Sequence, residues 1–364
     1  MKKIHFSSKT SRNDFITYAM VVILFIVVEV LMHMGLLNSQ MQGLLVPLCV
    51  YSIMAVSLNL VVGILGELSL GHAGFMSVGA FMGTTAAIAL QNSIPSAPLR
   101  LTVALIVGAV FAAIVGFLVG IPVLRLNGDY LAIVTLAFGE IIKSIFNNLY
   151  LGIDANGIHL SLLEDKTNLL EGGKLIIAGP MGIGGIKKIA NFSAGIILIL
   201  ICLVVIFHLV NSRQGRAIMA VRDNRIAAES VGINVTHYKM MAFVTSAAMA
   251  GAAGALFALN YSTIVANKFD FNTSILVLVF VVFGGLGNML GSVIAAAALT
   301  ILPEALRSFA SYRMLIYAIV LILVMLFTNN QRLRHLIDTL WRSIIGLFRR
   351  KKTNPVPEGG VSDE

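Results

Sequence analysis

The chain has 364 residues, of which 58% are hydrophobic and 12% charged, and its mean hydropathy is +0.91. Soluble domains carry about 25% charged residues, so this composition excludes an ordinary soluble domain. The formal net charge of +9 gathers in segments between apolar runs, which indicates membrane topology and argues against a nucleic-acid partner. Cys49 and Cys202 lie in apolar runs and have neither metal-ligand nor disulfide spacing.

The apolar runs predict an all-α polytopic membrane protein with about eight full transmembrane helices. A bilayer core about 30 Å thick requires roughly 20 mainly apolar residues per span. The first run follows basic residues, as in a signal peptide, but it is long, contains Glu29 and lacks a cleavage pattern. We therefore interpret it as a retained span. The predicted spans are 15–37, 43–65, 74–91, 99–124, 129–149, 194–210, 240–260 and 313–328.

The distribution of Lys and Arg sets the expected orientation, because short cytoplasmic loops carry an excess of both. Basic residues cluster before the first span, in 211–239 and after residue 331. Both termini and 211–239 are therefore expected in the cytoplasm, and 150–193 outside. Six predicted spans precede 211–239, the span 240–260 then leads outside, and 313–328 returns the chain to the cytoplasm. The apolar stretch 273–302 must therefore enter and leave on the same face of the membrane.

Two apolar segments are interrupted by glycine. The first is Gly66–Gly74, and the second is the run of Gly284, Gly285 and Gly287 inside 273–302. Irregular backbone at membrane depth is tolerated where it is buried in protein or lines a cavity. Glycine-interrupted segments therefore predict re-entrant elements near a transport pathway. The alternative for both is a tight turn between closely packed helices.

Ionisable residues inside spans are costly and suggest function or pairing. Glu140 and Lys143 stand three apart, so one helix face can pair them, as a structural pair near the outer interface or as a substrate contact. Glu29 and His33 stand four apart in the first span and suggest a buried polar pair or a partner contact. His72 has no second ligand at metal spacing, so no metal site is expected.

The segment 211–239 is polar, basic and amphipathic, and it lies between two spans. A short helix held at the membrane surface in this position suits contact with a soluble partner, whereas the simpler interpretation is a loop that only obeys the charge bias. The residues expected to couple the membrane domain to such a partner are Arg222, Asn224, Ala227, Ala228, Glu229 and Gly232.

No sequence pattern predicts an enzyme. There is no phosphate-binding loop, because Gly172-Gly173-Lys174 is followed by Leu175, and no catalytic or cofactor motif. Transport would therefore draw its energy from an ion gradient or from another subunit. No catalytic residue, metal or cofactor is expected.

The remaining segments complete the domain plan, in which 1–330 form the transmembrane domain. The nearly neutral loop 150–193 is rich in glycine turns and suits a docking surface, a lid or a solvated excursion. Residues 331–352 have the pattern of a basic amphipathic helix in the membrane interface, contacting lipid, or packed on a partner. The polar residues 353–364 are expected to be disordered.

Five segments together resemble the permeases of branched-chain amino-acid ABC transporters, in particular the M-type subunit. They are Leu58–Gly63, Leu68–Phe75, Gly128–Glu140, Gly215–Asn234 and Phe283–Gly291. The resemblance implies a homologous second permease, two ATP-binding subunits and an extracytoplasmic substrate-binding protein. It also implies that Ala227-Ala228-Glu229-x-x-Gly232 couples the permease to the ATPase. The outer loop departs in length from the compact family form, and only Gly179–Ile183 is similar to it.

The resemblance predicts a permease subunit of an ATP-driven importer in a bacterial or archaeal cytoplasmic membrane, moving branched-chain or related neutral amino acids by alternating access. Two alternatives stay open: a permease for urea or a short amide, and a stand-alone ion-coupled carrier. Candidate pathway residues are polar groups in the spans 43–65 and 129–149, and polar groups or glycines at the two breaks. They are Asn59, Ser69, His72, Thr135, Gly284, Gly285 and Gly287.

The predicted orientation is testable by cysteine labelling from each side of the membrane. A Lys166→Cys variant should react with a membrane-impermeant thiol reagent from the outside, and an Arg213→Cys variant only from the cytoplasm, because 211–239 carries the basic excess. Reaction of the cysteine introduced at position 166 from the cytoplasmic side alone would show that the orientation is wrong.

Overall fold

The computed structural model describes residues 9–35, 39–91, 93–126, 128–154, 157–162 and 174–306, together with Ile319 and Ile322. Residues up to Ala305 belong to one compact unit. The amphipathic helix expected at 331–352 and the segment 353–364 lie outside the described residues, as does the span 313–328 apart from the two isoleucines.

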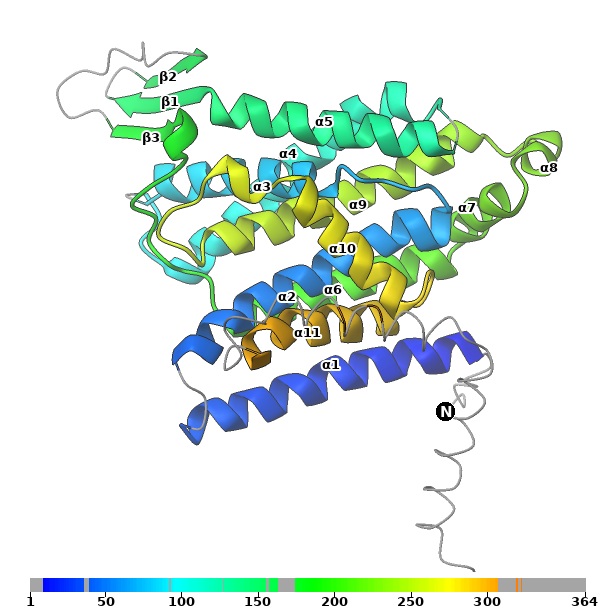
Figure 1. Cartoon of the computed structure of the whole chain (residues 1–364), viewed down its shortest axis with the longest axis horizontal. Coiled ribbons are helices and arrows are strands. Elements are labelled where there is room, and N and C mark those ends of the chain that lie inside the picture. The colour runs from blue at the N-terminus through cyan, green and yellow to red at the C-terminus, as the bar shows by residue number, and fades with distance from the viewer. Residues whose placement is uncertain are drawn as a thin grey trace, which may run out of the picture. The chain divides into compact units, whose positions relative to one another are not determined.

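The unit is mainly helical, as the composition predicts (Figure 1). Polar side chains cap four helices, because Ser212, Asn224, Asn234 and Asp270 each accept a backbone N–H at the start of the helix that follows. The α-helices are α1 Lys9–His33, α2 Ser39–Asn59, α3 His72–Ala89, α4 Ala97–Val123, α5 Asp129–Asn147, α6 Phe192–Asn211, α7 Arg213–Asp223, α8 Arg225–Ser230, α9 Val235–Ala258, α10 Phe271–Gly284 and α11 Met289–Ala305. A π-helix, η1 Leu60–Leu65, extends α2, and short 3-10 helices lie at η2 Gly179–Met181 and η3 Ala266–Lys268.

Seven of the described helical segments are long and apolar enough to cross a membrane. Six coincide with predicted spans, on α1, on α2 with its extension η1, and on α4, α5, α6 and α9. The seventh joins η3 and α10 over Ala266–Gly284, where the sequence predicts a half-helix. The segment 74–91 does form a helix, α3, but it is not among the seven. Most of its side chains are buried and many are small.

Glycines hold α3, α4 and α9 in close contact. A Cβ atom on Gly79 of α3 would lie 1.9 Å from the carbonyl oxygen of Gly251, and one on Gly251 would lie 2.3 Å from the Cβ of Ala112 on α4. Helices in lipid associate through van der Waals packing, which small residues maximise. Ala247, Gly251 and Ala255, which are spaced four residues apart on α9, therefore form a surface of small residues that packs against α3 and α4.

The predicted break in 273–302 is confirmed, because α10 ends at Gly284 and α11 begins at Met289. A Cβ on Gly291 would lie 1.8 Å from the carbonyl oxygen of Gly284, so the two helices fold back on each other at backbone distance. Gly285 and Gly287 have φ angles of 90° and 81°, which L-amino acids with side chains rarely adopt. We call residues 285–288 the tip of this hairpin.

The all-α prediction misses one feature, a three-stranded antiparallel sheet in 150–193. Strands β1 Leu149–Asp154, β2 Gly157–Leu162 and β3 Lys174–Ala178 pair in the order β2-β1-β3. The β1–β2 hairpin runs from Leu149 opposite Leu162 to Asp154 opposite Gly157, and the β1–β3 register shifts between Leu151 and Gly152. These strands have only five or six residues, which is shorter than the roughly 20 apolar residues by which membrane spans were predicted.

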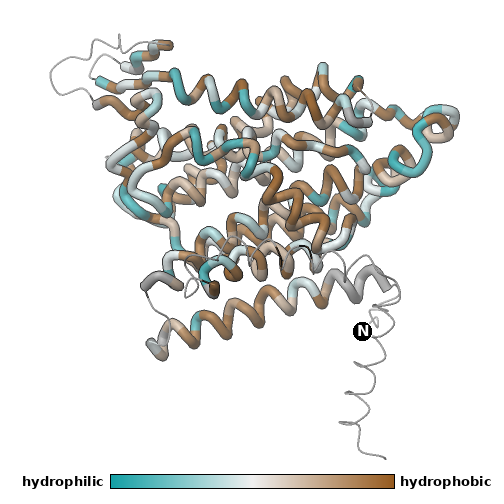
Figure 2. The backbone as a smooth tube through the Cα atoms, viewed as in Figure 1, coloured by the Kyte–Doolittle hydropathy of each residue, from teal (hydrophilic) through white to brown (hydrophobic). Residues whose placement is uncertain are grey.

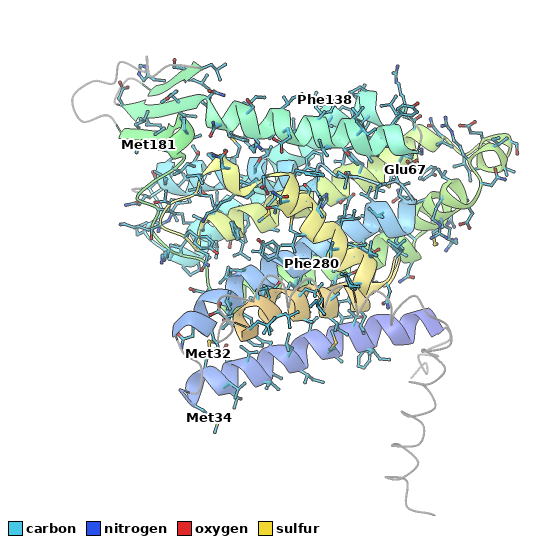
Figure 3. The ribbon with its side chains drawn as sticks, viewed as in Figure 1. Met32, Met34, Glu67, Phe138, Met181 and Phe280 are labelled. Carbon is cyan, nitrogen blue, oxygen red and sulfur yellow. The ribbon has the colours of Figure 1, made fainter. Side chains whose placement is uncertain are left out.

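The sheet is attached to the loop between α9 and α10. Ile183 and Ile264 exchange backbone hydrogen bonds of 2.9 and 3.0 Å. Figure 1 shows the sheet and the pair α7–α8 at opposite ends of the helices, and Figure 2 shows mainly apolar helices between these two ends. Side-chain labels show the same separation, with Met181 beside the sheet and Glu67 near α7 (Figure 3).

Candidate functional site

Asn59, at the end of α2, holds the second glycine break. Its side-chain oxygen accepts a hydrogen bond of 2.8 Å from the backbone N–H of Gly287, and its Nδ2 donates one of 2.8 Å to Ser292 Oγ. Both Asn59 and Ser292 are fully buried. These bonds hold the tip of the α10–α11 hairpin against η1. They also give the backbone N–H of Gly287, which lies between two helices, a hydrogen-bond partner within the protein.

The first break packs against α5 and α10. A Cβ on Gly71 would lie 2.1 Å from the carbonyl oxygen of Thr135, and Thr135 Oγ1 accepts a 3.1 Å hydrogen bond from the N–H of Leu70. The N–H of Ala73, in the first turn of α3, donates to Ser274 Oγ on α10 at 3.1 Å. Both breaks are thus held by polar side chains from neighbouring helices, as buried irregular backbone requires.

The structure places the polar pathway candidates in the interior of the chain. Asn59, Ser69, His72 and Thr135 are all buried. His72 Nε2 lies 2.8 Å from Ser57 Oγ, and in the described part of the chain Ser69 Oγ has no hydrogen-bond partner. Three of the four candidates therefore hold backbone or side-chain partners in this conformation, and their contact with a substrate stays a prediction.

The segment 211–239 forms two short helices, α7 and α8, where the sequence predicts one short surface helix. Ser212 caps α7 and Asn224 caps α8, accepting from the N–H of Ala227 at 3.0 Å. Val221, Ala228 and Val235 form a small buried cluster that holds α7, α8 and the start of α9 together. Of the six predicted coupling residues, Ala228 faces this cluster, whereas the other five are exposed.

Two large apolar side chains are exposed at this helix pair. Ile226 on α8 is 80% exposed, and Val231, directly after α8, is 74% exposed. Glu229 pairs with Arg225 across one turn of α8, with 3.1 Å between Oε1 and Nε. Gly232 has a φ of 84°, and no atom lies within 4 Å of where its Cβ would be. A glycine is therefore favoured at position 232 by the backbone conformation and not by close packing within this chain.

A buried ion pair joins the first break to α9. Lys239 Nζ donates to Glu67 Oε1, and the two side chains are only 4% and 13% exposed. Both residues line a hollow of about 760 Å³ between η1, α7 and α8. Glu67 is labelled in Figure 3. Arg222, Asn224 and Glu229 line the same hollow, so half of the predicted coupling residues meet there.

The remaining ionisable candidates lie elsewhere. Glu140 and Lys143 form the predicted ion pair on α5, and both side chains are partly exposed. Glu29 on α1 is half-buried, and its Oε2 has no hydrogen-bond partner among the residues that the structure describes. The side chain of His33, its expected partner, is outside the described part.

Sequence reasoning missed Lys239 and the serines that hold the breaks. Lys239 is 172 residues from Glu67, and Ser292 is 233 residues from Asn59. The usable signal for Lys239 is a lysine one turn inside the apolar helix α9, where a charge requires a partner. No comparable signal distinguishes Ser274 or Ser292 from other serines in spans.

These features define a polytopic membrane protein with the interrupted helices that are typical of transporters. The family model for the permease component of the branched-chain amino acid transport system matches residues 40–327. The chain therefore belongs to that family.

Two relatives are high-affinity branched-chain amino acid transport system permease proteins LivM, from Salmonella typhimurium and Escherichia coli. Each is 37% identical over 287 residues, which cover 76% of this chain and 66% of the relative. The fructose import permease protein FruG of Bifidobacterium longum is 25% identical over 244 residues, which cover 64% of this chain and 67% of that protein. The match thus spans just under two thirds of the length of the LivM relatives. No solved structure matches the chain.

The Glu67–Lys239 pair should stabilise the fold measurably. Removing one partner of a buried ion pair leaves a charge without compensation and costs about 3–5 kcal/mol. Lys239→Met should therefore lower the unfolding temperature in detergent, and adding Glu67→Gln to it should restore most of the loss.

The exposed pair Arg225–Glu229 provides a matched control, because surface pairs at this spacing contribute about 0.3–0.5 kcal/mol. Arg225→Met should have little effect on the unfolding temperature. Equal losses for Lys239→Met and Arg225→Met would contradict the importance of burial.

Proposed function

We propose that this chain is a permease subunit of an ATP-driven importer for branched-chain amino acids in a bacterial or archaeal cytoplasmic membrane. Family membership supports the transport role, and the LivM relatives favour branched-chain substrates over urea or short amides. The sequence lacks a phosphate-binding loop, so ATP hydrolysis falls to partner subunits.

The observation that carries this proposal is the open helix pair α7–α8. Its outward side chains Ile226 and Val231 are apolar, although the helices themselves are polar and lie at one end of the bundle (Figure 2). Large apolar side chains this exposed on polar, charged helices suit a surface that a partner protein covers. A soluble ATP-binding subunit docked here would cover both side chains and pair with Glu229 or Arg225.

The complete importer contains this chain, a homologous second permease, two ATP-binding subunits and an extracytoplasmic binding protein. The basic excess of 211–239 supports an orientation with α7–α8 in the cytoplasm and the sheet outside. Substrate arrives at the outer face and crosses between the two permeases by alternating access. A stand-alone ion-coupled carrier would leave the open α7–α8 surface without a role.

Reconstitution of the complete complex in liposomes tests the function. Leucine uptake should require ATP and the binding protein, and unlabelled isoleucine or valine should compete for it while urea and fructose should not. Glu229→Lys and Gly232→Val should each reduce uptake by about tenfold or more, because both change the surface that couples the subunits.

Gly35→Val is the matched control for Gly232→Val. Gly35 also has a positive φ, of 69°, with no atom within 4 Å of its Cβ position, but it lies at the end of α1. Its variant should keep uptake near the wild-type rate. Leucine uptake that persists without the ATP-binding subunits would instead support an ion-coupled carrier.

A further inference from the structure

The end of η1 is attached to α7 through one arginine. Arg222 Nη1 donates a 3.2 Å hydrogen bond to the carbonyl oxygen of Gly63, one of the last carbonyls of the helix, which have no partner within it. Its cationic group also suits the negative end of the helix dipole. Gly66 makes room for this contact, because a Cβ there would lie 2.5 Å from Arg222 Cγ.

The same turn of η1 holds the tip of the α10–α11 hairpin. A Cβ on Gly63 would lie 2.0 Å from Asn59 Oδ1 and 2.2 Å from the amide nitrogen of Gly287. Residue 63 is therefore in contact with α7 through its carbonyl and with the tip through its bare Cα. Two elements that are distant in sequence meet on one residue.

The local backbone suits a moving part. Residues 60–65 are π-helical, a rare conformation that occurs frequently at functional sites. The tip has positive φ angles at Gly285 and Gly287, and Leu286 between them is 59% exposed. By contrast, Asn59 itself is fully buried, and its hydrogen bond to Ser292 Oγ on α11 is shielded from water, whereas its bond to the N–H of Gly287 is partly buried.

We propose that Arg222, Gly63 and Asn59 form a mechanical link that carries displacement of α7 to the tip of the α10–α11 hairpin. The inference rests on the proposed function, in which ATP-binding subunits move α7. Arg222 and Asn59 act as positioning residues, and neither contacts substrate in this role. The link joins one glycine from each break, Gly66 and Gly287, to the surface helix α7.

The test compares ATP hydrolysis with leucine uptake in the reconstituted complex. Asn59→Ala removes both side-chain bonds to the hairpin, and Arg222→Met removes the bond to Gly63. Each should raise the number of ATP molecules consumed per leucine about tenfold, a ratio that corrects for any change in the rate of hydrolysis itself. Arg222→Lys keeps a donor for the carbonyl and should restore much of the coupling.

Two further variants separate coupling from folding. Ser292→Ala keeps the shape of the site and removes one bond, so it should raise the ratio in the same direction, by less, even if Asn59→Ala fails to assemble. Thr84→Val is the control, because Thr84 is buried on α3 and its Oγ1 has no hydrogen-bond partner within the described ranges. Its ratio should equal that of the wild type.

A labelling readout makes the test independent of the substrate. The thiol-labelling rate of a Leu286→Cys variant should change when ATP binds, and adding Asn59→Ala should abolish that change. Both native cysteines are buried, which keeps the background low. A wild-type complex that hydrolyses ATP without moving leucine would contradict the proposed function. Unchanged ratios, together with an undiminished ATP response of the thiol at position 286 in the Asn59→Ala background, would overturn the link itself.

Discussion

A polypeptide inside an apolar bundle must satisfy its own backbone groups, and the hydrogen bond from the N–H of Gly287 to Asn59 Oδ1 does this at the break between α10 and α11. The Asn59 side chain that makes this bond is fully buried, whereas Gly287 is half-buried. The bare Cα of Gly63 leaves room for this contact, because a Cβ there would lie 2.0 Å from Asn59 Oδ1 and 2.2 Å from the amide nitrogen of Gly287. The irregular backbone of the tip is therefore joined to η1 by specific contacts.

The rest of the bundle follows a second rule of the membrane environment, in which burial from water does little to draw helices together. Glycine and alanine let α3, α4 and α9 pack at backbone distance, and buried serines add hydrogen bonds between helices. The charged pair Glu67–Lys239 lies where this tightly packed core meets the polar helices α7 and α8. A displacement of these helices would thus reach the core at Glu67 as well as at Gly63.

The sequence predicts those parts of the structure that depend on local pattern. Six spans follow from the length of apolar runs, the break at Gly284 from glycine, and the Glu140–Lys143 pair from its spacing on one helix. A short helix in 211–239 follows from its amphipathic pattern, although the structure divides it into α7 and α8. Each of these features is decided by interactions between residues close in sequence.

The features that the sequence does not predict depend on contacts between distant residues. The Asn59–Gly287 bond joins positions 228 apart, and a single sequence contains no measure of such pairing. The short strands of the sheet are held by pairing with each other and by attachment to Ile264, not by their own hydropathy. Gly232 is a glycine because its φ is positive, a property of backbone conformation that the sequence alone does not distinguish from close approach.

The distance between spin labels on α8 and on the tip tests the central claim most directly. Labels at Ile226 and Leu286 occupy exposed positions at the two ends of the link, and a third at Leu160 on the sheet serves as an external reference. If α7–α8 and the tip are mechanically joined, ATP binding should change both distances to residue 160 and leave the distance between 226 and 286 nearly constant. A large change between 226 and 286 would contradict the account.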